Sequence, residues 1–443
     1  MNRIHSSMVC EQGAGWRLRI VLALAIGISA GLIGHHWRAS QTLSHNTLLQ
    51  AHERENQFAQ RQGETTSRSA LGFILLGVTG TFCLLNVRID RLNWTHPLTI
   101  IFVAFVGWSI LSIVWSNTPM LSFRKASILG LMAIGAYGIA ARVELNDLIW
   151  ITILYIAGLV AIGLCAELAL GTFRPWISGY RFAGTQHPNS IGMKSAVLCL
   201  AATMVAFTKR DYLWLRCGLF VMGFTTLLLT KSRTALAALV VAGLVVALLS
   251  CRGRNRLLLG SLLVSIVCLL GIALNFVTIK GINDFGEIAS LGRRENVESL
   301  TGRIPLWSEL ITAADDRLWL GHGIGGFWNS ERIERYSDMF LWDIPHAHNS
   351  YLDLILSVGI VGLTLYLLWL LSVGFTSVAR YERTGVKGDL FVVSVVLFSL
   401  VHALAESKIP APGMPTFLLF ACAAAVAFQS SPESKMLTAE RRA

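Results

Sequence analysis

Charge is scarce in this chain of 443 residues, of which only 14% are Asp, Glu, Lys or Arg and 54% are hydrophobic. About a quarter of the residues of a soluble globular protein are charged, so the composition argues against an ordinary soluble domain. Long apolar runs take the place of the missing charge, and an α-helix crosses the hydrocarbon of a bilayer in about 20 such residues. The composition therefore indicates a protein embedded in a membrane.

Cysteine is missing from the longest polar segment, residues 278–348, and the eight cysteines nearly all lie inside or at the edge of apolar runs. This distribution argues against a disulfide framework or a cysteine-based metal site and favours small core residues. A phosphate-loop motif is also absent, and the glycines of segment 321–326 lack the strand-to-helix unit of a nucleotide-binding fingerprint. The sequence thus gives no indication of a bound nucleotide.

The apolar runs predict an all-α, polytopic transmembrane protein with about 12 spans. The predicted spans are 17–34, 70–86, 97–115, 122–141, 148–170, 190–207, 213–230, 234–250, 257–277, 349–375, 388–405 and 413–429. The first run is not interpreted as a signal peptide, because no small-residue cleavage site follows it. Three regions result, listed in chain order: residues 1–277 with spans 1 to 9 and the extracytoplasmic loop 35–69, residues 278–348 as a large periplasmic loop, and residues 349–443 with spans 10 to 12 and a cytoplasmic tail.

The net charge of +11 is spread in short clusters between apolar runs, a pattern that membrane topology explains better than nucleic-acid binding. Lys and Arg are equally numerous on the two sides of the predicted spans. On one side, however, many of them lie in the long segments 35–69 and 278–348, whose length weakens their effect on orientation. We therefore expect both termini in the cytoplasm and these two segments outside the inner membrane.

Basic residues also occupy the short extracytoplasmic connections, where the positive-inside rule disfavours them. We expect them to bind an anion at the outer membrane face, and snorkelling toward lipid phosphates is the alternative. The basic residues are Arg124, Lys125, Arg174, Arg181, Lys231, Arg233 and Lys408, and the accompanying acid is Glu406.

The large loop is long enough to fold above the membrane. Its residues 299–307 predict the beginning of a helix, with Thr301 as the cap and an apolar stripe formed by Trp307, Leu310 and Ile311. The glycines of segment 321–326 permit a tight backbone excursion.

Two histidines, His346 and His348, end the large loop directly before an apolar helix that contains Gly359 and Gly362. An imidazole at the mouth of a spanning helix can accept or donate a proton near neutral pH, at the depth of the lipid headgroups. This position suits a reaction on a lipid-linked substrate. Interfacial histidines without a chemical role are the alternative, as is a metal site, although no Asp, Glu or Cys set is spaced nearby to complete one.

Two more polar segments interrupt the apolar runs on the same side. Residues 230–234 form a very short polar connection between two apolar runs. Within it, the Arg233 guanidinium offers a rigid fork of donors that suits a phosphate. Segment 179–189 carries Arg181 and opens the sixth span, and the Pro-Asn pair at its end fits a capped helix start equally well. Arg303 in the large loop completes this set of outward-facing arginines.

The spacing His348-Asn349, nine residues, Gly359, two residues, Gly362 resembles the signature of the O-antigen ligases. Their superfamily also holds O-antigen polymerases and bacterial protein O-oligosaccharyltransferases. Further segments are similar to it in the same order, over about residues 70–430: the stretch 182–189, the Ser-Arg pair 232–233, the helix beginning at 302–303 and the glycines of 321–326.

The resemblance implies that Arg233 and Arg303 hold a pyrophosphate and that His348 acts at the acceptor or the leaving group. Transfer from undecaprenyl pyrophosphate breaks an anomeric C–O bond and leaves a diphosphate, whose developing charge two fixed guanidiniums would stabilise. The donor already stores the energy, so neither a metal nor another cofactor is expected. The residues expected to contact the substrate are Arg181, Lys231, His346 and Asn349.

By this resemblance we expect a metal-independent glycosyltransferase of lipopolysaccharide or exopolysaccharide biosynthesis in the bacterial inner membrane. It would move a preassembled glycan from undecaprenyl pyrophosphate to an acceptor hydroxyl at the periplasmic face, as an O-antigen ligase does. Lipid A–core, another lipid-linked glycan and a protein hydroxyl remain open as acceptors, so a polymerase or a protein O-oligosaccharyltransferase is the alternative. A polysaccharide transporter or flippase is the rival of another class, but few ionisable residues lie mid-membrane as transport requires. No nucleic acid partner is expected.

Overall fold

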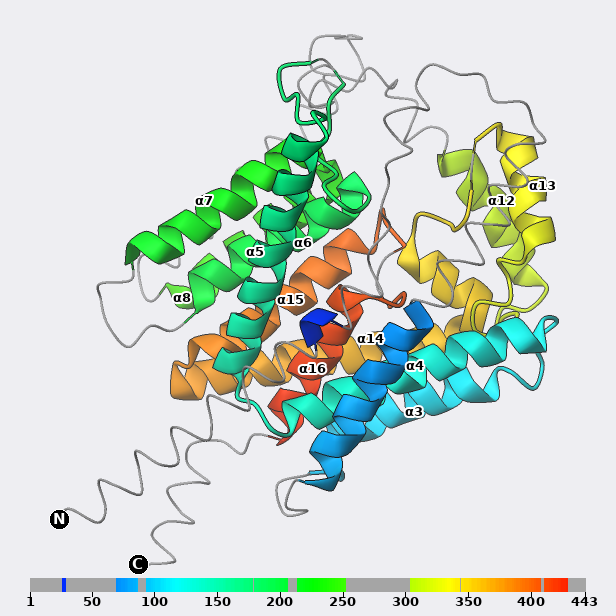
Figure 1. Ribbon diagram of the computed structural model, residues 1–443. Coiled ribbons are helices and arrows are strands. Elements are labelled where there is room, and N and C mark those ends of the chain that lie inside the picture. Colours follow the sequence, from blue (N-terminus) through cyan, green and yellow to red (C-terminus); the bar gives the residue numbers. More distant parts are fainter. Residues whose placement is uncertain are drawn as a thin grey trace, which may run out of the picture.

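The computed structural model describes residues 26–28, 69–86, 93–177, 179–205, 213–251, 303–342, 344–407 and 410–428, and the regular structure within them is helical (Figure 1). The labelled helices are α3 (Pro97–Leu111), α4 (Pro119–Ala140), α5 (Leu145–Ala169), α6 (Pro188–Met204), α7 (Leu213–Thr230), α8 (Arg233–Ser250), α12 (Arg303–Asp315), α13 (Ser330–Phe340), α14 (Ser350–Thr384), α15 (Lys387–His402) and α16 (Met414–Phe428). Another helix, Ser69–Leu85, precedes α3.

A helix occupies each predicted span that lies within these residues, which confirms the all-α fold class. The predicted span 257–277 lies outside the described residues, and so does the span 17–34 apart from residues 26–28. In the part of the chain that the structure describes, four helices, α5, α7, α8 and α14, are long and apolar enough to cross a membrane. Helices Ser69–Leu85, α3 and α16 are apolar but shorter. The number of spans and the placement of the large loop remain predictions.

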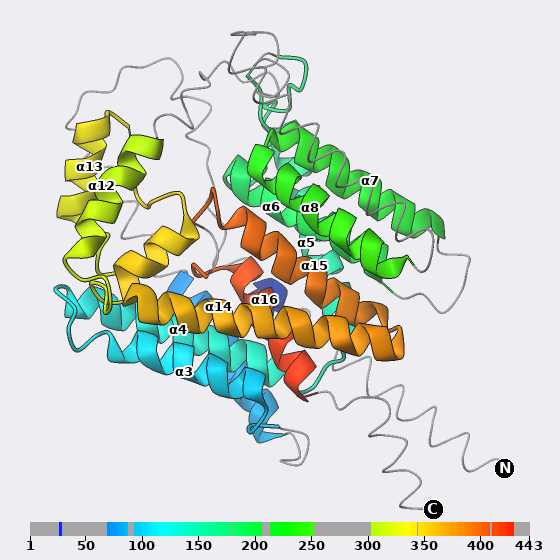
Figure 2. The ribbon, with the colours of Figure 1, turned by 180° about the vertical axis from the view of Figure 1, so that it is seen from behind.

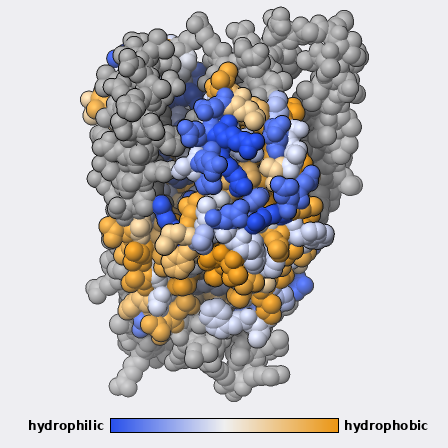
Figure 3. Space-filling model, turned by 90° about the vertical axis from the view of Figure 1, so that its right-hand side faces the viewer, coloured by the Kyte–Doolittle hydropathy of each residue, from blue (hydrophilic) through white to orange (hydrophobic). Residues whose placement is uncertain are grey.

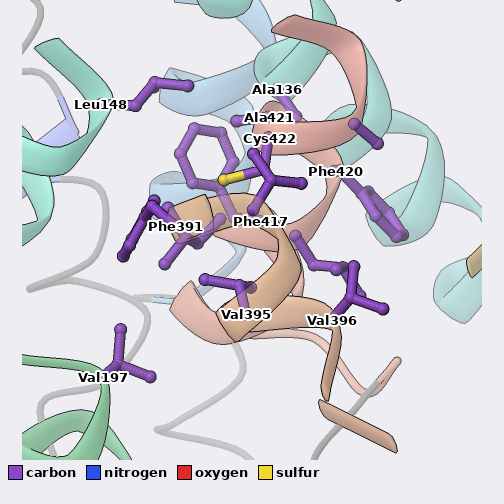
Figure 4. Close-up of a cluster of buried hydrophobic side chains, with 14 of the residues drawn as sticks. Ala136, Leu148, Val197, Phe391, Val395, Val396, Phe417, Phe420, Ala421 and Cys422 are labelled. Carbon is purple, nitrogen blue, oxygen red and sulfur yellow. The ribbon is translucent and has the colours of Figure 1, made fainter. Parts of the chain in front are cut away.

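The core of the bundle is built around α16, whose buried face and alanine-rich sequence let α4, α5 and α15 approach closely (Figure 4). Leu419, Phe420 and Cys422 are completely buried there. Large apolar side chains of the outer helices are exposed instead, for example Leu154 and Phe375. Such exposure fits contact with lipid. On the face seen in Figure 3, hydrophilic side chains gather in the upper part and hydrophobic ones lie below them.

The connections between helices meet at two opposite ends of the bundle. The motif end, as we call it, holds residues 112–118, 170–177, 179–187, 231–232, 303–342, 344–349, 403–407 and 410–413. At the opposite end Arg142 donates to the carbonyl oxygen of Asn86 at 2.8 Å, and Arg380 forms an ion pair with Asp389 at 3.0 Å. This division matches the two sides that the sequence predicts, while the side that faces the periplasm remains a prediction.

Helix α14 is interrupted at Gly359, where φ is 71°, and the segment 318–322 docks on the break (Figure 2). The N–H of Ile360 donates to the carbonyl of Leu318 at 2.8 Å, and the carbonyl of Leu356 accepts from the N–H of His322 at 2.9 Å. A Cβ on Gly359 would lie 2.1 Å from the carbonyl oxygen of Trp319, so this position requires glycine. The signature glycine of α14 and the loop glycines therefore form one structural unit.

The same loop also contacts the end of α3. Arg317 donates to the carbonyl of Trp115 at 2.9 Å, and the indole N–H of Trp115 donates to the carbonyl of Leu320 at 3.0 Å. The positive φ angles of Gly321, Gly323 and Gly325 confirm the expected backbone excursion.

The apolar stripe of α12 differs from the prediction. Leu306, Leu310 and Ala314 are buried, whereas Ile311 is 56% exposed. The buried positions recur every four residues and begin at Leu306, one residue before Trp307. The helix face that carries Ile311 is therefore turned away from the core. The expected cap, Thr301, lies outside the described residues.

Candidate functional site

The turn between α15 and α16, residues 403–407, is the point at which the predicted site segments meet. Arg303, the first residue of α12, donates to the carbonyl of Ala405 at 2.8 Å, and the Asn349 side-chain amide donates to the carbonyl of Leu404 at 3.2 Å. The hydroxyl of Ser350 donates to the carbonyl of Glu406 at 2.8 Å. The turn thereby fixes the beginnings of α12 and α14 beside each other.

A chain of polar side chains extends from this turn to the beginnings of α6 and α8. The buried Glu406 carboxylate accepts from the Asn189 amide at 2.8 Å, and Asn189 accepts in turn from the Arg181 guanidinium. Arg181 also donates to the carbonyl of Thr230 at 2.9 Å, one residue before Lys231. Segments widely separated in the sequence are joined by these bonds.

Arg303 carries its charge within electrostatic reach of two other site residues. Burial lowers the pKa of the Arg303 guanidinium, the Glu406 carboxylate opposes this shift, and the positive charge of Arg233 adds to it. Arg233 is the first residue of α8 and is half-buried. Arg303 thus lies within electrostatic reach of one carboxylate and of one further guanidinium. Such a pair of guanidiniums is suited to binding an additional anion.

The loop that carries Arg181 is organised by Glu167. Its carboxylate accepts from the backbone N–H groups of Ala183 and Gly184, at 2.9 and 2.7 Å, and from the hydroxyl of Tyr180. A buried carboxylate with three donors is well satisfied. Glu167, a buried residue near the end of α5, therefore anchors this loop.

The backbone before α14 is held on both sides of His348. The carbonyl of Ala347 accepts from the indole N–H of Trp307 at 2.8 Å, and its N–H donates to the carboxylate of Asp353 at 3.1 Å. The Asn349 side chain caps α14 by accepting from the N–H groups at 351 and 352. These contacts hold His348 in the left-handed region, with φ at 53°.

The two imidazole rings are in contact. The rings of His346 and His348 are 4.2 Å apart between centroids, and the ring of Trp342 lies 5.3 Å from that of His348. Nδ1 of His346 accepts from the backbone N–H of His348 at 3.3 Å. A left-handed, non-glycine residue is strained by roughly 1 kcal/mol, and such strain clusters at functional sites. The pair is therefore the best candidate for proton transfer.

A cavity of about 680 Å³ lies between α3, α4, α13, α14 and the segment before α16. Its wall includes His346, Ser350 and Asp353, as well as Arg124 and Lys125 of α4. His348 does not belong to this wall, and neither do Arg181, Arg233 and Arg303, which we call the arginine cluster. The cavity thus borders the His346–Ser350 segment without including the arginine cluster.

The structure therefore brings most of the predicted site residues together. Among them, Lys231 lies in the turn before Arg233, with a positive φ of 52°. The structure also adds residues that the sequence reasoning did not assign to the site. Asn189 and Glu406 link the arginines, and Asp353 supports the histidine segment. One sequence feature pointed to Glu406 as a site residue, because it is the single acid among the basic residues of the short outer connections. Within the described residues, no three His, Cys, Asp or Glu side chains gather as metal ligands.

Comparison with known proteins gives two matches. A family model described as O-Antigen ligase matches residues 218–367, a range that contains Arg233, Arg303, both histidines of the pair and the signature glycines. The exopolysaccharide production protein ExoQ of Rhizobium meliloti (strain 1021) is 28% identical over 336 residues, which cover 72% of this chain and 74% of the relative. The superfamily of that domain consists of membrane glycosyltransferase-like ligases and polymerases. Its match, the relative and the apolar helices together confirm that this multi-pass membrane protein resembles the O-antigen ligase and polymerase superfamily.

Proposed function

We propose that this protein moves a preassembled glycan from undecaprenyl pyrophosphate to an acceptor hydroxyl at the periplasmic face of the inner membrane, as an O-antigen ligase does. The observation that carries the proposal is the 403–407 turn, which bonds Arg303 and Asn349 directly and Arg181 through Asn189, beside the strained His348. Both termini would then lie in the cytoplasm, with the motif end of the bundle outside.

The reaction replaces one C–O bond by another. The acceptor oxygen bonds to the anomeric carbon, and the bond from that carbon to the diphosphate breaks with the electron pair going to the leaving group. Arg233 and Arg303 would stabilise the charge that develops on the diphosphate, in a half-buried site where such contacts are stronger than in water. His348 would take the proton of the acceptor hydroxyl.

The contacts of the remaining predicted residues suggest supporting roles. The Arg181 guanidinium bonds Thr230 and Asn189, and the Asn349 amide caps α14 and bonds Leu404. We therefore propose that Arg181 and Asn349 position the cluster and the histidine. Lys231, on the turn before Arg233, is placed to attract the diphosphate.

A polymerase of exopolysaccharide is the second candidate. The relative from Rhizobium meliloti is named for exopolysaccharide production, which favours an exopolysaccharide over an O-antigen as the product. The two candidates share the donor site and differ only in the acceptor.

The test is an in vitro transfer assay with the purified full chain, an undecaprenyl-pyrophosphate glycan and a chelator of divalent ions. Lipid A–core, a lipid-linked glycan repeat and a hydroxyl-containing peptide are offered as acceptors in separate reactions. We expect transfer to lipid A–core if the protein is a ligase, or chain extension of the repeat if it is a polymerase. The proposal fails if no acceptor is glycosylated, and its metal independence fails if activity requires an added divalent ion.

A further inference from the structure

The cavity beside His346 combines an apolar wall with charge, as a binding site for an amphiphile does. Phe105 of α3, Leu129 and Met132 of α4, and Leu354 and Val358 of α14 form the apolar wall. These residues belong to helices that the sequence places within the membrane, so the apolar wall lies at a depth that a lipid chain occupies.

Two basic residues stand at the same cavity. Arg124 and Lys125 follow each other on α4 and both contribute to the wall. Gly325 accommodates the lysine, because a Cβ at this glycine would lie 2.8 Å from Cγ of Lys125. Neighbouring like charges repel each other, and the positive-inside rule disfavours them at the outer face, so an anion bound between them would be stabilised.

Asp353 is the acid of the cavity wall, and its carboxylate is already engaged. It accepts from the indole N–H of Trp328 at 2.7 Å and from the N–H of Ala347 at 3.1 Å. These donors offset its charge locally, so Arg124 and Lys125 give the cavity wall its positive charge.

The cavity also borders the residues of the proposed chemistry. His346 belongs to its wall and touches the ring of His348. Ser350, another wall residue, bonds the carbonyl of Glu406 in the turn that Arg303 contacts. A ligand in the cavity would therefore place a hydroxyl beside the histidine pair while the donor diphosphate occupies the arginines.

We propose that this cavity is a second lipid site, which binds the phosphate of a lipid-linked acceptor with Arg124 and Lys125 and its chain with the apolar wall. The inference rests on the proposed glycan transfer, because only a two-substrate reaction requires an acceptor beside the histidines. The acceptor class that it names is an anionic amphiphile and not a protein hydroxyl.

The experiment is photo-crosslinking of the purified full chain with farnesyl monophosphate that carries a diazirine, followed by peptide mass spectrometry. We expect labelled peptides from residues 121–132 or 324–333. Excess unlabelled farnesyl monophosphate should suppress the labelling, whereas inorganic phosphate or uncharged farnesol should not. Equal suppression by inorganic phosphate would indicate a site for free anions, and equal suppression by farnesol a purely apolar cavity, and either result overturns the inference.

Variants separate this site from the arginine cluster. The double variant Arg124→Ala/Lys125→Ala should lower the labelling yield at least about tenfold, while Arg303→Ala should leave the yield unchanged. Arg174→Ala, which removes an exposed charge on the same predicted side, is the matched control. Ser357→Phe fills the cavity without changing charge, and it should abolish labelling even if the double variant folds poorly. Labelling that survives both cavity variants overturns the inference.

Crosslinking does not depend on turnover, so the experiments can contradict the proposed lipid site and the proposed glycan transfer independently of each other. A labelled, charge-dependent cavity in a protein without transfer activity would contradict the proposed function and the acceptor role, but the lipid site would stand. Transfer activity with an unlabelled cavity would overturn the second site alone.

Discussion

His348 owes its position to neighbours and not to its own backbone preference. Trp307 and Asp353 hold the peptide groups of Ala347, and Asn349 caps the following helix. Each of these bonds is made by groups of the neighbouring residues and does not require the imidazole of His348. Replacing this side chain should therefore keep the backbone before α14 in place.

We expect His348→Ala to reduce glycan transfer by at least about 100-fold, the lower range for loss of a general acid or base. Membrane insertion and protein level should stay near those of the wild type. The in vitro transfer assay measures the rate, and immunoblotting of membranes measures the level. His346→Ala is the matched control, and if it is the inactive variant while His348→Ala transfers normally, the assignment within the pair is wrong.

The arginines offer a test of geometry at fixed charge. A diphosphate held by a planar fork should not accept an ammonium equally well, so Arg233→Lys and Arg303→Lys should both be impaired and each Ala variant more so. Loss of a charged hydrogen bond to the developing anion should cost about 2–4 kcal/mol of transition-state stabilisation, or about 30- to 1,000-fold in rate.

Arg181→Lys should have a smaller effect, because two nitrogens of Arg181 already bond Thr230 and Asn189, whereas one nitrogen of Arg303 bonds Ala405. The same assay supplies the rates, and Arg174→Lys is the exposed control. Rates close to wild type for both Arg233→Lys and Arg303→Lys would remove the argument from bidentate binding.

At the scale of helices and loops, periodicity and length predict most of the described fold. Helix α7 occupies the predicted span 213–230, and α8 differs from its span by one residue. The break at Gly359 was not predicted, because a single glycine in an apolar run is compatible with a continuous helix. Its cause is the docking of segment 318–322, which local sequence does not show.

We expect Gly359→Ala to destabilise the protein by at least about 2 kcal/mol, because alanine combines a left-handed φ with a clash against the backbone of Trp319. Thermal unfolding in detergent and limited proteolysis of the 318–326 loop measure the effect. Gly130→Ala in α4 is the control, since its Cβ would meet nothing within 4 Å. Equal melting temperatures for the two variants would mean that the loop does not depend on the break.

For the whole molecule, the sequence predicts which residues belong to the motif end but not how they meet. Arg181, Arg233 and Arg303 were singled out by residue type and by their side of the membrane. The 403–407 turn, which Arg303 contacts, carries no motif, and the chain of bonds from Arg181 through Asn189 to Glu406 follows from tertiary packing. The cavity likewise requires four helices and therefore has no local signature.

The orientation of the bundle is testable with reporter fusions. Fusions at Gly292 and Ser330 should report a periplasmic location, and fusions at Gly253 and Gly385 a cytoplasmic one. Alkaline phosphatase and green fluorescent protein are each active on one side of the membrane only, so their activities report the location of the fusion site. Each reporter serves as the control of the other. The opposite pattern would place the arginine cluster beside the cytoplasmic nucleotide pool and reopen a nucleotide-sugar mechanism.

The interrupted helix α14 has a consequence for the order of biogenesis. An unpaired carbonyl in lipid costs several kcal/mol, and the carbonyl of Leu356 at the break accepts from the N–H of His322. The ribosome makes segment 318–322 before α14, so the partner is already synthesised when the broken helix reaches the bilayer. Docking of that loop then becomes a checkpoint for insertion, and chains whose loop cannot dock would be exposed to membrane proteases before they acquire any activity.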